Sequence, residues 1–394
     1  MELSVIIVSY KVQPYLEQCL YSLLRAVNRL DAEIFVVDNA SEDGTAAWLE
    51  SSFPQIQTIP LSENIGFSRA NNLVLPRVSG KYVLFLNPDT LQEEDGLEKC
   101  LAFMEAHPEA GALGVRMMNG FGAYLHESKR GMPGALASLF KFAGLTARFP
   151  KHRFLARYYM GHLHARQSHT VPVLAGAYML VRASVLQEVG GFDERFFMFG
   201  EDIDLSRRIG QAGWKNYYYA DVLLIHFKGQ STDKGSDAYA KYFFGAMSLY
   251  VRKYYGGALS FLYRQILQAG IFLQKTRTAL LPPRPRHWTP ETVRFNYLIV
   301  GSENDVRTFL SQYDTTGVFF FTLNPERSTI RNIHPYLGLD GGSPVLFCLG
   351  ELTYAEVLRW MDVTGWEAPC FFHDVRSLGI VGPYKGWPIP FKRK

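Results

Sequence analysis

The strongest constraint on the fold is an alternation, over the first 115 residues, of short apolar runs with segments of helical periodicity. Leu3–Val8 is a continuous apolar run rich in β-branched residues, whereas Pro14–Leu24 carries leucines at helical spacing. Glu33–Val37, Gln57–Leu61 and Lys81–Leu86 are predicted strands. Strand–helix alternation is typical of a parallel, doubly wound sheet, so the sequence predicts an α/β domain here.

Polar side chains follow three of the predicted strands directly. Ser9, Asp38 and Asp89 each stand at or just beyond the point where a strand ends. In doubly wound sheets, the carboxyl ends of the strands form the crevice that binds ligands. A single aspartate in such a place is more often a helix cap. Polar residues after three separate strands instead predict a binding site at one edge of the sheet.

Further acids and one histidine extend this set. Glu201 and Asp202 begin a predicted helix, and His226 follows the apolar run Val222–Ile225. With Asp89 they offer oxygen and nitrogen ligands of the kind that bind Mg²⁺ or Mn²⁺ together with substrate phosphates. A single histidine after a strand is more often structural, and this is the alternative for His226.

The composition is that of a folded protein with an uneven distribution of charge. Of the 394 residues, 47% are hydrophobic and 20% are charged, which excludes intrinsic disorder. The formal net charge of +4 gives no reason to expect a nucleic-acid partner. Nine Lys and Arg residues and no acid occupy 128–187, and eight with no acid occupy 238–290. Such segments favour phosphate-bearing ligands or an anionic membrane surface, with ordinary solvated basic faces as the alternative.

Several features indicate the compartment. The chain starts with an apolar strand and lacks the basic start of a secretory signal. No apolar run is long enough to span a bilayer. We therefore expect a cytoplasmic protein, either free or peripheral on the inner face of the plasma membrane. The four cysteines lack the spacing of a zinc site, and we expect them to be buried thiols in a reducing compartment. They are Cys19, Cys100, Cys348 and Cys370.

Changes in the pattern predict three parts. Residues 1–235 contain the predicted sheet and its site. Residues 236–290 are predicted as basic amphipathic helices followed by a Pro-rich linker, and residues 291–394 as a small α/β, Rossmann-like domain. Leu298–Ser302 resembles a nucleotide-binding strand and turn but lacks the GxGxxG pattern. We interpret this last part as an interaction or regulatory domain with no assigned ligand.

Five motifs occur along the chain in order. They are Ser9-Tyr10, Val36–Ser41, Asn64–Asn72, Asn87-Pro88-Asp89 and Gly200–Asp204. In these motifs and their spacing, the chain resembles the inverting glycosyltransferases of family 2 and, within them, the bacterial rhamnosyltransferase-like branch. The resemblance covers roughly residues 1–255. It implies the GT-A fold, that of the nucleotide-diphospho-sugar transferases, for the first part of the chain.

The resemblance also implies roles for single residues. Asp202 matches the family's catalytic base, with Glu201 as its neighbour. Asp89 and His226 match the ligands of a divalent metal, Mg²⁺ or Mn²⁺. Gly176 lies in a small-residue segment that lines the acceptor side in the family, and a packed strand is the alternative. The positions that match the nucleotide-sugar site are Ser9, Asp38, Asn64, Gly66, Arg69 and Asn87, the last in place of the first acid of the family's DxD motif.

The resemblance implies transfer of a rhamnose-like hexose from a dTDP- or UDP-sugar. The expected acceptor is a glycan or a polyprenyl-diphosphate-linked glycan of cell-surface polysaccharide synthesis. A nucleotidyltransferase is one alternative, but it usually carries a Gly-rich basic loop where this chain has Ser9-Tyr10-Lys11-Val12. A non-catalytic scaffold of a glycan-assembly complex is another, and the presence of both Asp89 and Asp202 argues against it.

Overall fold

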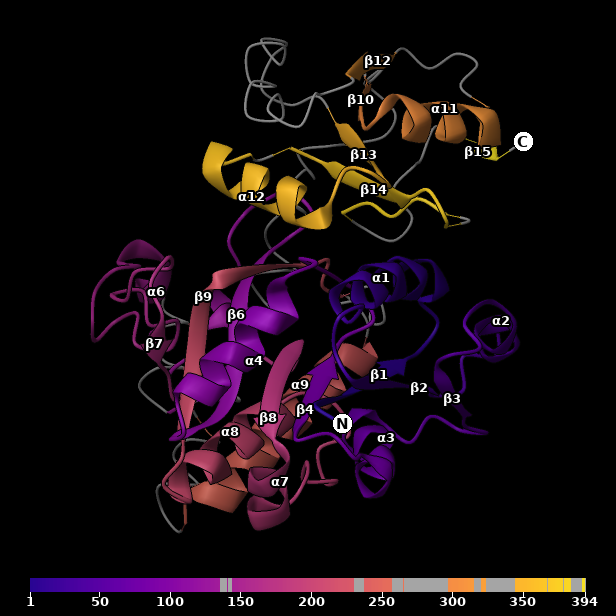
Figure 1. The fold of residues 1–394 in the computed structure, drawn as a ribbon. Helices are drawn as coiled ribbons and strands as arrows, with labels where there is room; N and C mark the ends of the chain where they lie inside the picture. Colours follow the sequence, from indigo (N-terminus) through magenta and orange to yellow (C-terminus); the bar gives the residue numbers. More distant parts are fainter. Residues whose placement is uncertain are drawn as a thin grey trace.

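The structure, a computed structural model, describes residues 1–134, 140, 144–229, 237–256, 265, 297–314, 320–323, 344–366, 368–377, 379–383 and 392–393. The described residues form two α/β units, each built on a main sheet of its own. The second unit lies against one side of the first (Figure 1).

The element bounds are as follows. The first unit contains β1 (Leu3–Ser9), α1 (Gln13–Ala26), β2 (Ala32–Asp38), α2 (Thr45–Ser52), β3 (Gln57–Pro60), α3 (Phe67–Val74), η1 (Leu75–Arg77), β4 (Tyr82–Leu86), β5 (Thr90–Gln92), α4 (Gly96–Ala106), β6 (Ala110–Met118), η2 (His126–Ser128), α6 (Leu145–Arg148), β7 (His169–Thr170), β8 (Tyr178–Arg182), α7 (Ala183–Val189), α8 (Glu201–Gln211) and β9 (Lys215–His226), and is followed by α9 (Asp237–Tyr254). The second contains β10 (Tyr297–Val300), α11 (Glu303–Gln312), β11 (Tyr313–Asp314), β12 (Phe320–Leu323), β13 (Val345–Leu349), α12 (Tyr354–Thr364), β14 (Cys370–Asp374) and β15 (Lys392–Arg393).

The first sheet has the strand order β3-β2-β1-β4-β8-β6-β9-β5, with β7 beside β9. β1 pairs in parallel with β2 on one side and with β4 on the other. The prediction of a parallel sheet holds for this half. The other half, beyond the strands on which the prediction rested, is mixed: β6 runs parallel to β9, whereas β8 runs antiparallel to β4 and β5 runs antiparallel to β9. β5 follows β4 after only Asn87, Pro88 and Asp89, yet it lies at the far edge of the sheet beside β9, so its pairing is set by a strand distant in the chain.

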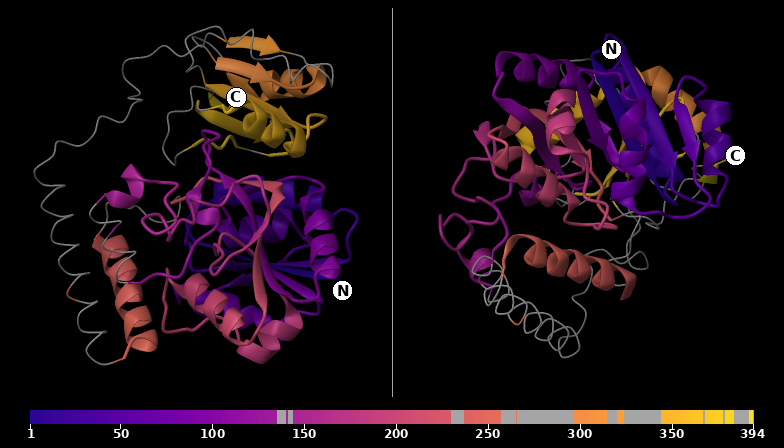
Figure 2. Two further views of the ribbon diagram at one scale, coloured as in Figure 1. Left: turned by 90° about the vertical axis from the view of Figure 1, so that its left-hand side faces the viewer. Right: turned by 90° about the horizontal axis from the view of Figure 1, so that it is seen from below.

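Helices cover both faces of this sheet (Figure 2). Along β1, Leu3, Val5 and Ile7 join one apolar cluster, with α1, α2 and α4. Ile6 and Val8 join another, with α3, α7 and α8. Burial on both faces is the reason why the strand is apolar throughout instead of alternating. All four cysteines are buried and free, as predicted.

The second unit is a small parallel sheet with the order β12-β10-β13-β14. Its two described helices begin at polar caps. The Ser302 hydroxyl accepts a hydrogen bond from the Asp305 N–H at 3.1 Å before α11, and Thr353 and Glu356 form a capping box before α12. The predicted small α/β fold is therefore confirmed. The domain boundaries at 235 and 290, and the Pro-rich linker, lie outside the described residues and stay predictions.

The two units share one apolar cluster. Tyr15 and Phe227 of the first unit belong to the same buried cluster as Phe347 and Phe372 of the second. The centroid of the Phe227 ring lies 5.2 Å from that of Tyr15 and 5.9 Å from that of Phe372. The Tyr15 hydroxyl also donates to the Gly382 carbonyl at 3.0 Å. The second unit is thus packed on the first through a common core.

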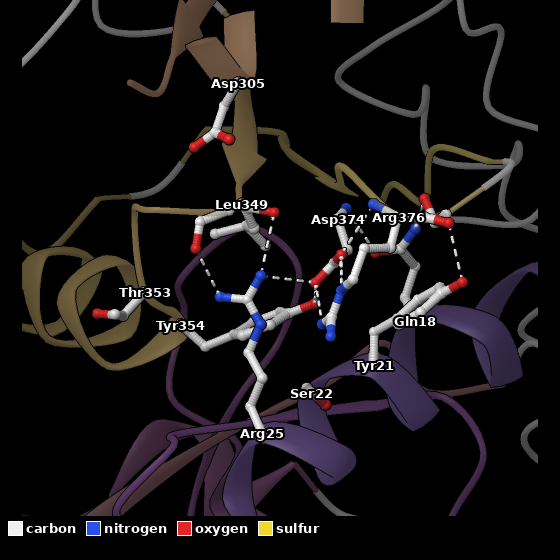
Figure 3. A network of polar contacts seen from close by, with 12 residues as sticks. Gln18, Tyr21, Ser22, Arg25, Asp305, Leu349, Thr353, Tyr354, Asp374 and Arg376 are labelled. Atoms are coloured by element: carbon white, nitrogen blue, oxygen red, sulfur yellow. Dashed lines mark hydrogen bonds and ion pairs between the residues drawn. The ribbon is translucent and has the colours of Figure 1, made fainter. Parts of the chain in front are cut away.

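Arg25 of α1 connects the units through polar contacts (Figure 3). Its guanidinium donates to the carbonyl oxygens of Leu349 and Gly350, at 3.2 and 3.1 Å. It also donates to the Asp374 carboxylate at 2.9 Å, which Arg376 contacts as well. These acceptors stand at the carboxyl ends of β13 and β14, where open parallel sheets usually bind ligands. Here a side chain of the first unit occupies that edge.

Two further contacts hold α12 on the first unit. Glu94 accepts hydrogen bonds from the N–H groups of Tyr354 and Ala355, at 2.8 and 2.9 Å, and so places a negative charge at the helix N-terminus. Arg116 of β6 donates through both terminal nitrogens to the Asp362 carboxylate, near the other end of α12. Contacts at both ends fix the direction of this helix.

α9 is the described helix of the basic segment predicted over 236–290. Near its C-terminal end, Lys253 forms ion pairs with Asp193 at 2.7 Å and with Asp204 at 2.5 Å. The Tyr254 hydroxyl donates to Asp204 at 2.7 Å. Lys253 and Tyr254 at this end of α9 therefore pack on the first unit, whereas Arg252 beside them is exposed. No helix within the described ranges is long and apolar enough to cross a membrane.

Replacing Arg25 with methionine is expected to lower the free energy of unfolding by about 3 kcal/mol, because the buried Asp374 carboxylate and two carbonyl groups lose a charged donor. Arg29 is exposed just beyond the same helix, and Arg29→Met is the matched control, expected within about 0.5 kcal/mol of the wild type. Urea unfolding of the full chain, followed by circular dichroism, measures both. Equal unfolding midpoints for the two variants would show that the Arg25 contacts do not hold the units together.

Candidate active site

Three strand ends meet at the carboxyl edge of the first sheet. β1 pairs with β2 so that Ser9 stands beside Asp38. On its other side, β1 pairs with β4, which ends immediately before Asn87. Ser9 and Asp38 are buried, and the Ser9 hydroxyl has no hydrogen-bond partner among the described residues. The structure thus brings three of the predicted site residues to one edge.

The Asp38 carboxylate is held by its own loop. It accepts a hydrogen bond from the Ser41 hydroxyl. Burial raises the pKa of Asp38, and the hydrogen bonds from Ser41 act against this shift. The loop turns sharply here, since Ala40 and Glu42 have φ values of 62° and 57°. The carboxylate therefore has a fixed place at the edge without any ligand.

Asn39, which sequence reasoning did not single out, joins this edge to the next loop. Its Oδ1 accepts a hydrogen bond from the Ile65 N–H at 3.0 Å, and its Nδ2 donates to the Asn64 Oδ1 at 2.9 Å. The same Asn64 oxygen accepts a hydrogen bond from the Gly66 N–H at 3.0 Å. These contacts bring Asn64 and Gly66 to the side of the Asp38 loop. The position of Asn39 within the Val36–Ser41 motif was the available signal.

Gly66 and Arg69 lie on the connection into α3. Gly66 has a φ of +85°, and a Cβ there would stand 2.6 Å from the Phe197 carbonyl oxygen. The packing against Phe197 by itself requires a glycine. The Arg69 guanidinium lies 3.6 Å from the Glu194 carboxylate, and both side chains are more than half exposed. An exposed ion pair of this kind contributes at most about 1 kcal/mol.

Asp89 and His226 come together although they lie far apart in the chain. β5 and β9 pair so that Thr90 stands beside His226, and the Phe227 N–H donates to the Asp89 carbonyl at 3.0 Å. The Asp89 Oδ1 lies 3.3 Å from the His226 Nε2. The Asn87 side-chain amide lies 3.4 Å from the same nitrogen. The structure therefore gathers the three predicted residues Asn87, Asp89 and His226.

Asp202 begins the first turn of α8 and contacts a second strand connection. Its Oδ2 accepts hydrogen bonds from the Gly176 N–H at 3.0 Å and from the Arg130 guanidinium. A Cβ at Gly176 would stand 3.3 Å from that of Asp202, so the small residue allows this approach. The two predicted residues Asp202 and Gly176 are thus direct neighbours.

Glu201, beside Asp202, is in a different electrostatic environment. Its side chain is buried, and its Oε2 has no hydrogen-bond partner among the described residues. Burial and then the charge of Asp202 raise the pKa of Glu201 to about 8. Glu201 therefore holds its proton more strongly than an ordinary glutamate does, whereas Asp202 accepts two hydrogen bonds on one oxygen. The two adjacent carboxyl groups therefore have different electrostatic surroundings.

Arg130 is a second site residue that the sequence pattern does not single out. It lies in the acid-free segment 128–187, for which the sequence favours phosphate-bearing ligands or an anionic membrane surface, yet its side chain is only 11% exposed. Lys129 next to it is also buried and donates to the carbonyls of Met160 and Leu163, at 3.0 and 2.9 Å. Composition shows that these residues are positively charged but not whether their side chains point into the protein or toward solvent. It therefore could not identify the contact of Arg130 with Asp202.

Known proteins share the sequence of this region. The family model described as "Glycosyl transferase family 2" matches residues 4–190. An N-acetylglucosaminyl-diphospho-decaprenol L-rhamnosyltransferase of Mycobacterium tuberculosis is 31% identical over 243 residues, which are 59% of this chain and 78% of that protein. The rhamnosyltransferase WbbL of Escherichia coli is 30% identical over 172 residues, 41% of this chain and 61% of that protein.

One solved structure with a similar chain path is the mannosyltransferase PcManGT from Pyrobaculum calidifontis in complex with GDP-Man and Mn²⁺. It has a TM-score of 0.44 and 20% identity, and covers 69% of each chain. The sheet and the sequence matches together define the first unit as a GT-A domain, the fold of nucleotide-diphospho-sugar transferases. The chain belongs to glycosyltransferase family 2.

The raised pKa of Glu201 predicts a pH-dependent stability. Because this pKa rises from 4.5 to about 8 on folding, the folded protein keeps a proton that the unfolded chain releases above its ordinary pKa. The stabilising effect is complete below about pH 4.5 and is lost as the pH rises toward 8. The wild type should therefore lose stability relative to Glu201→Gln between pH 5 and pH 8. Urea midpoints of both proteins at several pH values test this, and a constant difference would contradict it.

Proposed function

We propose that the chain is an inverting glycosyltransferase that transfers a rhamnose-like hexose from a dTDP- or UDP-sugar. The observation that carries this proposal is a continuous set of contacts between the two acidic clusters. The Asn87 N–H donates to the Ala177 carbonyl at 3.0 Å, and the preceding Gly176 donates to Asp202. A leaving group beside Asp89 and a hydroxyl beside Asp202 would thus approach the same sugar carbon, as single displacement requires.

The nucleotide part of the donor is proposed to lie along the ends of β1 and β2. The buried Ser9 hydroxyl and the fixed Asp38 carboxylate offer hydrogen-bonding groups there. A carboxylate accepts hydrogen bonds from a pyrimidine N3–H or from ribose hydroxyls. Asn64, Gly66 and Arg69 border this edge, and the exposed Arg69 can reach a phosphate. The identity of the base is left to experiment.

Asp89 and His226 are proposed to hold a divalent cation, Mg²⁺ or Mn²⁺. The donor set fits, because a carboxylate oxygen and an imidazole nitrogen 3.3 Å apart can contact one ion, with the Asn87 side chain alongside. No group of three or more His, Cys, Asp or Glu side chains suited to a metal occurs in the part of the chain that the structure describes. The remaining ligands are then the oxygens of the donor diphosphate and water. When bound, the ion neutralises charge on the departing diphosphate.

Asp202 is proposed as the general base. An acceptor hydroxyl that attacks the sugar must lose its proton, and a carboxylate in hydrogen-bond reach accepts it. Asp202 is suited to this role because it is ion-paired with Arg130, while burial and the charge of Asp202 raise the pKa of its neighbour Glu201. Gly176 borders the same place, on the acceptor side. The chain's own residues thus provide proton acceptance on the side opposite the diphosphate.

The acceptor is proposed to be a lipid-linked glycan. The Mycobacterium tuberculosis relative, by its name, acts on N-acetylglucosaminyl-diphospho-decaprenol. An acceptor of this class carries a diphosphate and lies at a membrane surface. The acid-free segment 238–290 and the exposed Arg252 of α9 supply positive charge for an anionic inner membrane face. We therefore propose a peripheral enzyme of cell-surface polysaccharide synthesis.

Asp202→Asn is expected to lower turnover at least about 100-fold and to leave the affinity for the nucleoside diphosphate unchanged. Release of nucleoside diphosphate, measured with a panel of nucleotide sugars and a polyprenyl-diphospho-N-acetylglucosamine acceptor, identifies the donor. Calorimetry then gives the affinity. The matched control is Asp221→Asn, at an exposed position of β9. If Asp202→Asn keeps more than about a tenth of wild-type turnover, Asp202 is not the base.

Asp89→Ala is expected to weaken binding of the nucleoside diphosphate chiefly when metal is present. In a chelator, where neither protein has the ion, the variant and the wild type should bind alike. Calorimetry with dTDP and UDP in Mg²⁺, in Mn²⁺ and in chelator makes the comparison. An equal loss of affinity in all three conditions would mean that Asp89 acts through the fold of the β4–β5 connection.

A further inference from the structure

Arg130 is hydrogen-bonded to the segment before β8 that contains Gly176. Its backbone forms an isolated bridge with Val173, with N–O distances of 3.2 and 3.0 Å in the two directions. Its Nη2 donates to the Leu174 carbonyl at 2.6 Å and to the Asp202 carboxylate. Both the backbone of Arg130 and its guanidinium group are therefore fixed by the segment next to Asp202, the proposed general base.

The Asp202 carboxylate has one acceptor site that its hydrogen bonds with the described residues do not use. Oδ2 accepts hydrogen bonds from Arg130 and from Gly176, and Oδ1 accepts one from the Ile203 N–H at 2.8 Å. A carboxylate has about four acceptor sites, two on each oxygen. Oδ2 is therefore saturated, whereas the described residues leave Oδ1 one acceptor site for a further donor, such as an acceptor hydroxyl.

We propose that Arg130 is a positioning residue that orients the Asp202 carboxylate, so that Oδ1 faces the attacking hydroxyl. The proposal rests on the proposed function, in which Asp202 is the base. Without the guanidinium, the carboxylate can rotate about its last bond and Oδ2 loses its charged donor. Misplacement of a catalytic group by about 1 Å can cost around 100-fold in rate.

The charges around Asp202 make this role measurable. The charged or titratable groups around it are the Arg130 guanidinium and the Glu201 carboxyl group, and Tyr158 interacts with the same guanidinium. An ionised Glu201 would repel the negative charge of Asp202, whereas the positive charge of Arg130 attracts it. Removing Arg130 takes this positive charge away from the carboxylate, and we expect the pH dependence of turnover to change as a result.

The test is turnover of the full chain as a function of pH, with the donor and acceptor identified above. Arg130→Met is expected to lower kcat about 10- to 100-fold, to move the acidic limb of the pH profile to higher pH, and to leave nucleoside diphosphate affinity unchanged. Arg130→Lys, which keeps the charge, should restore the position of that limb. The matched control is Arg153→Met, an exposed arginine of the same acid-free segment, with turnover as in the wild type.

A double variant separates this proposal from the proposed function. In an Asp202→Asn background, Arg130→Met should cause no further loss of kcat, because there is no carboxylate left to orient. An additional loss there, or a higher KM for the acceptor with an unmoved acidic limb, would overturn the proposal and place Arg130 against the substrate. Asp202→Asn with near wild-type turnover would instead refute the proposed function itself. Equal thermal unfolding of the variants shows that the fold is kept.

Discussion

The parallel pairing of β1 between β2 and β4 is the constraint on which the rest of the site depends. It brings the ends of three strands to one edge, and with them Ser9, Asp38 and Asn87. The register is strongly fixed, because β1 is buried along its whole length and a slip of one residue would exchange the side chains of its two faces. The sheet edge at which we propose that the nucleotide binds is therefore a consequence of how the core packs.

The second unit packs against the strands at whose ends Asp89 and His226 lie. β5 and β9 place Asp89 and His226 together, and Leu91 and Phe227 on these strands or next to them pack into the cluster shared with the second unit. Arg25 meanwhile occupies the strand ends where that unit would bind a ligand of its own. Packing of this kind gives the unit a structural connection to the proposed metal residues that a tethered domain would lack.

Local sequence patterns were sufficient for the strands of the first half-sheet and for the residues at their ends, because both follow from burial and chain direction. They were insufficient for β5 and β8, whose antiparallel pairing depends on distant strands. Arg130 and Asn39 were missed for a related reason: their contacts with Asp202 and Asn64 are tertiary, and no periodicity reports them. For Gly66, the sequence predicts a place in the nucleotide-sugar site. The structure shows that its packing against Phe197 requires glycine even without a ligand.

The central claim is that one sugar is transferred by a single displacement between the Asp89 and Asp202 clusters. The most direct measurement is proton NMR of the purified product together with assay of the released nucleotide. A single displacement gives a product whose anomeric configuration is opposite to that of the donor, with nucleoside diphosphate released in equal amount. A product that retains the donor configuration, or release of pyrophosphate in place of nucleoside diphosphate, would contradict it.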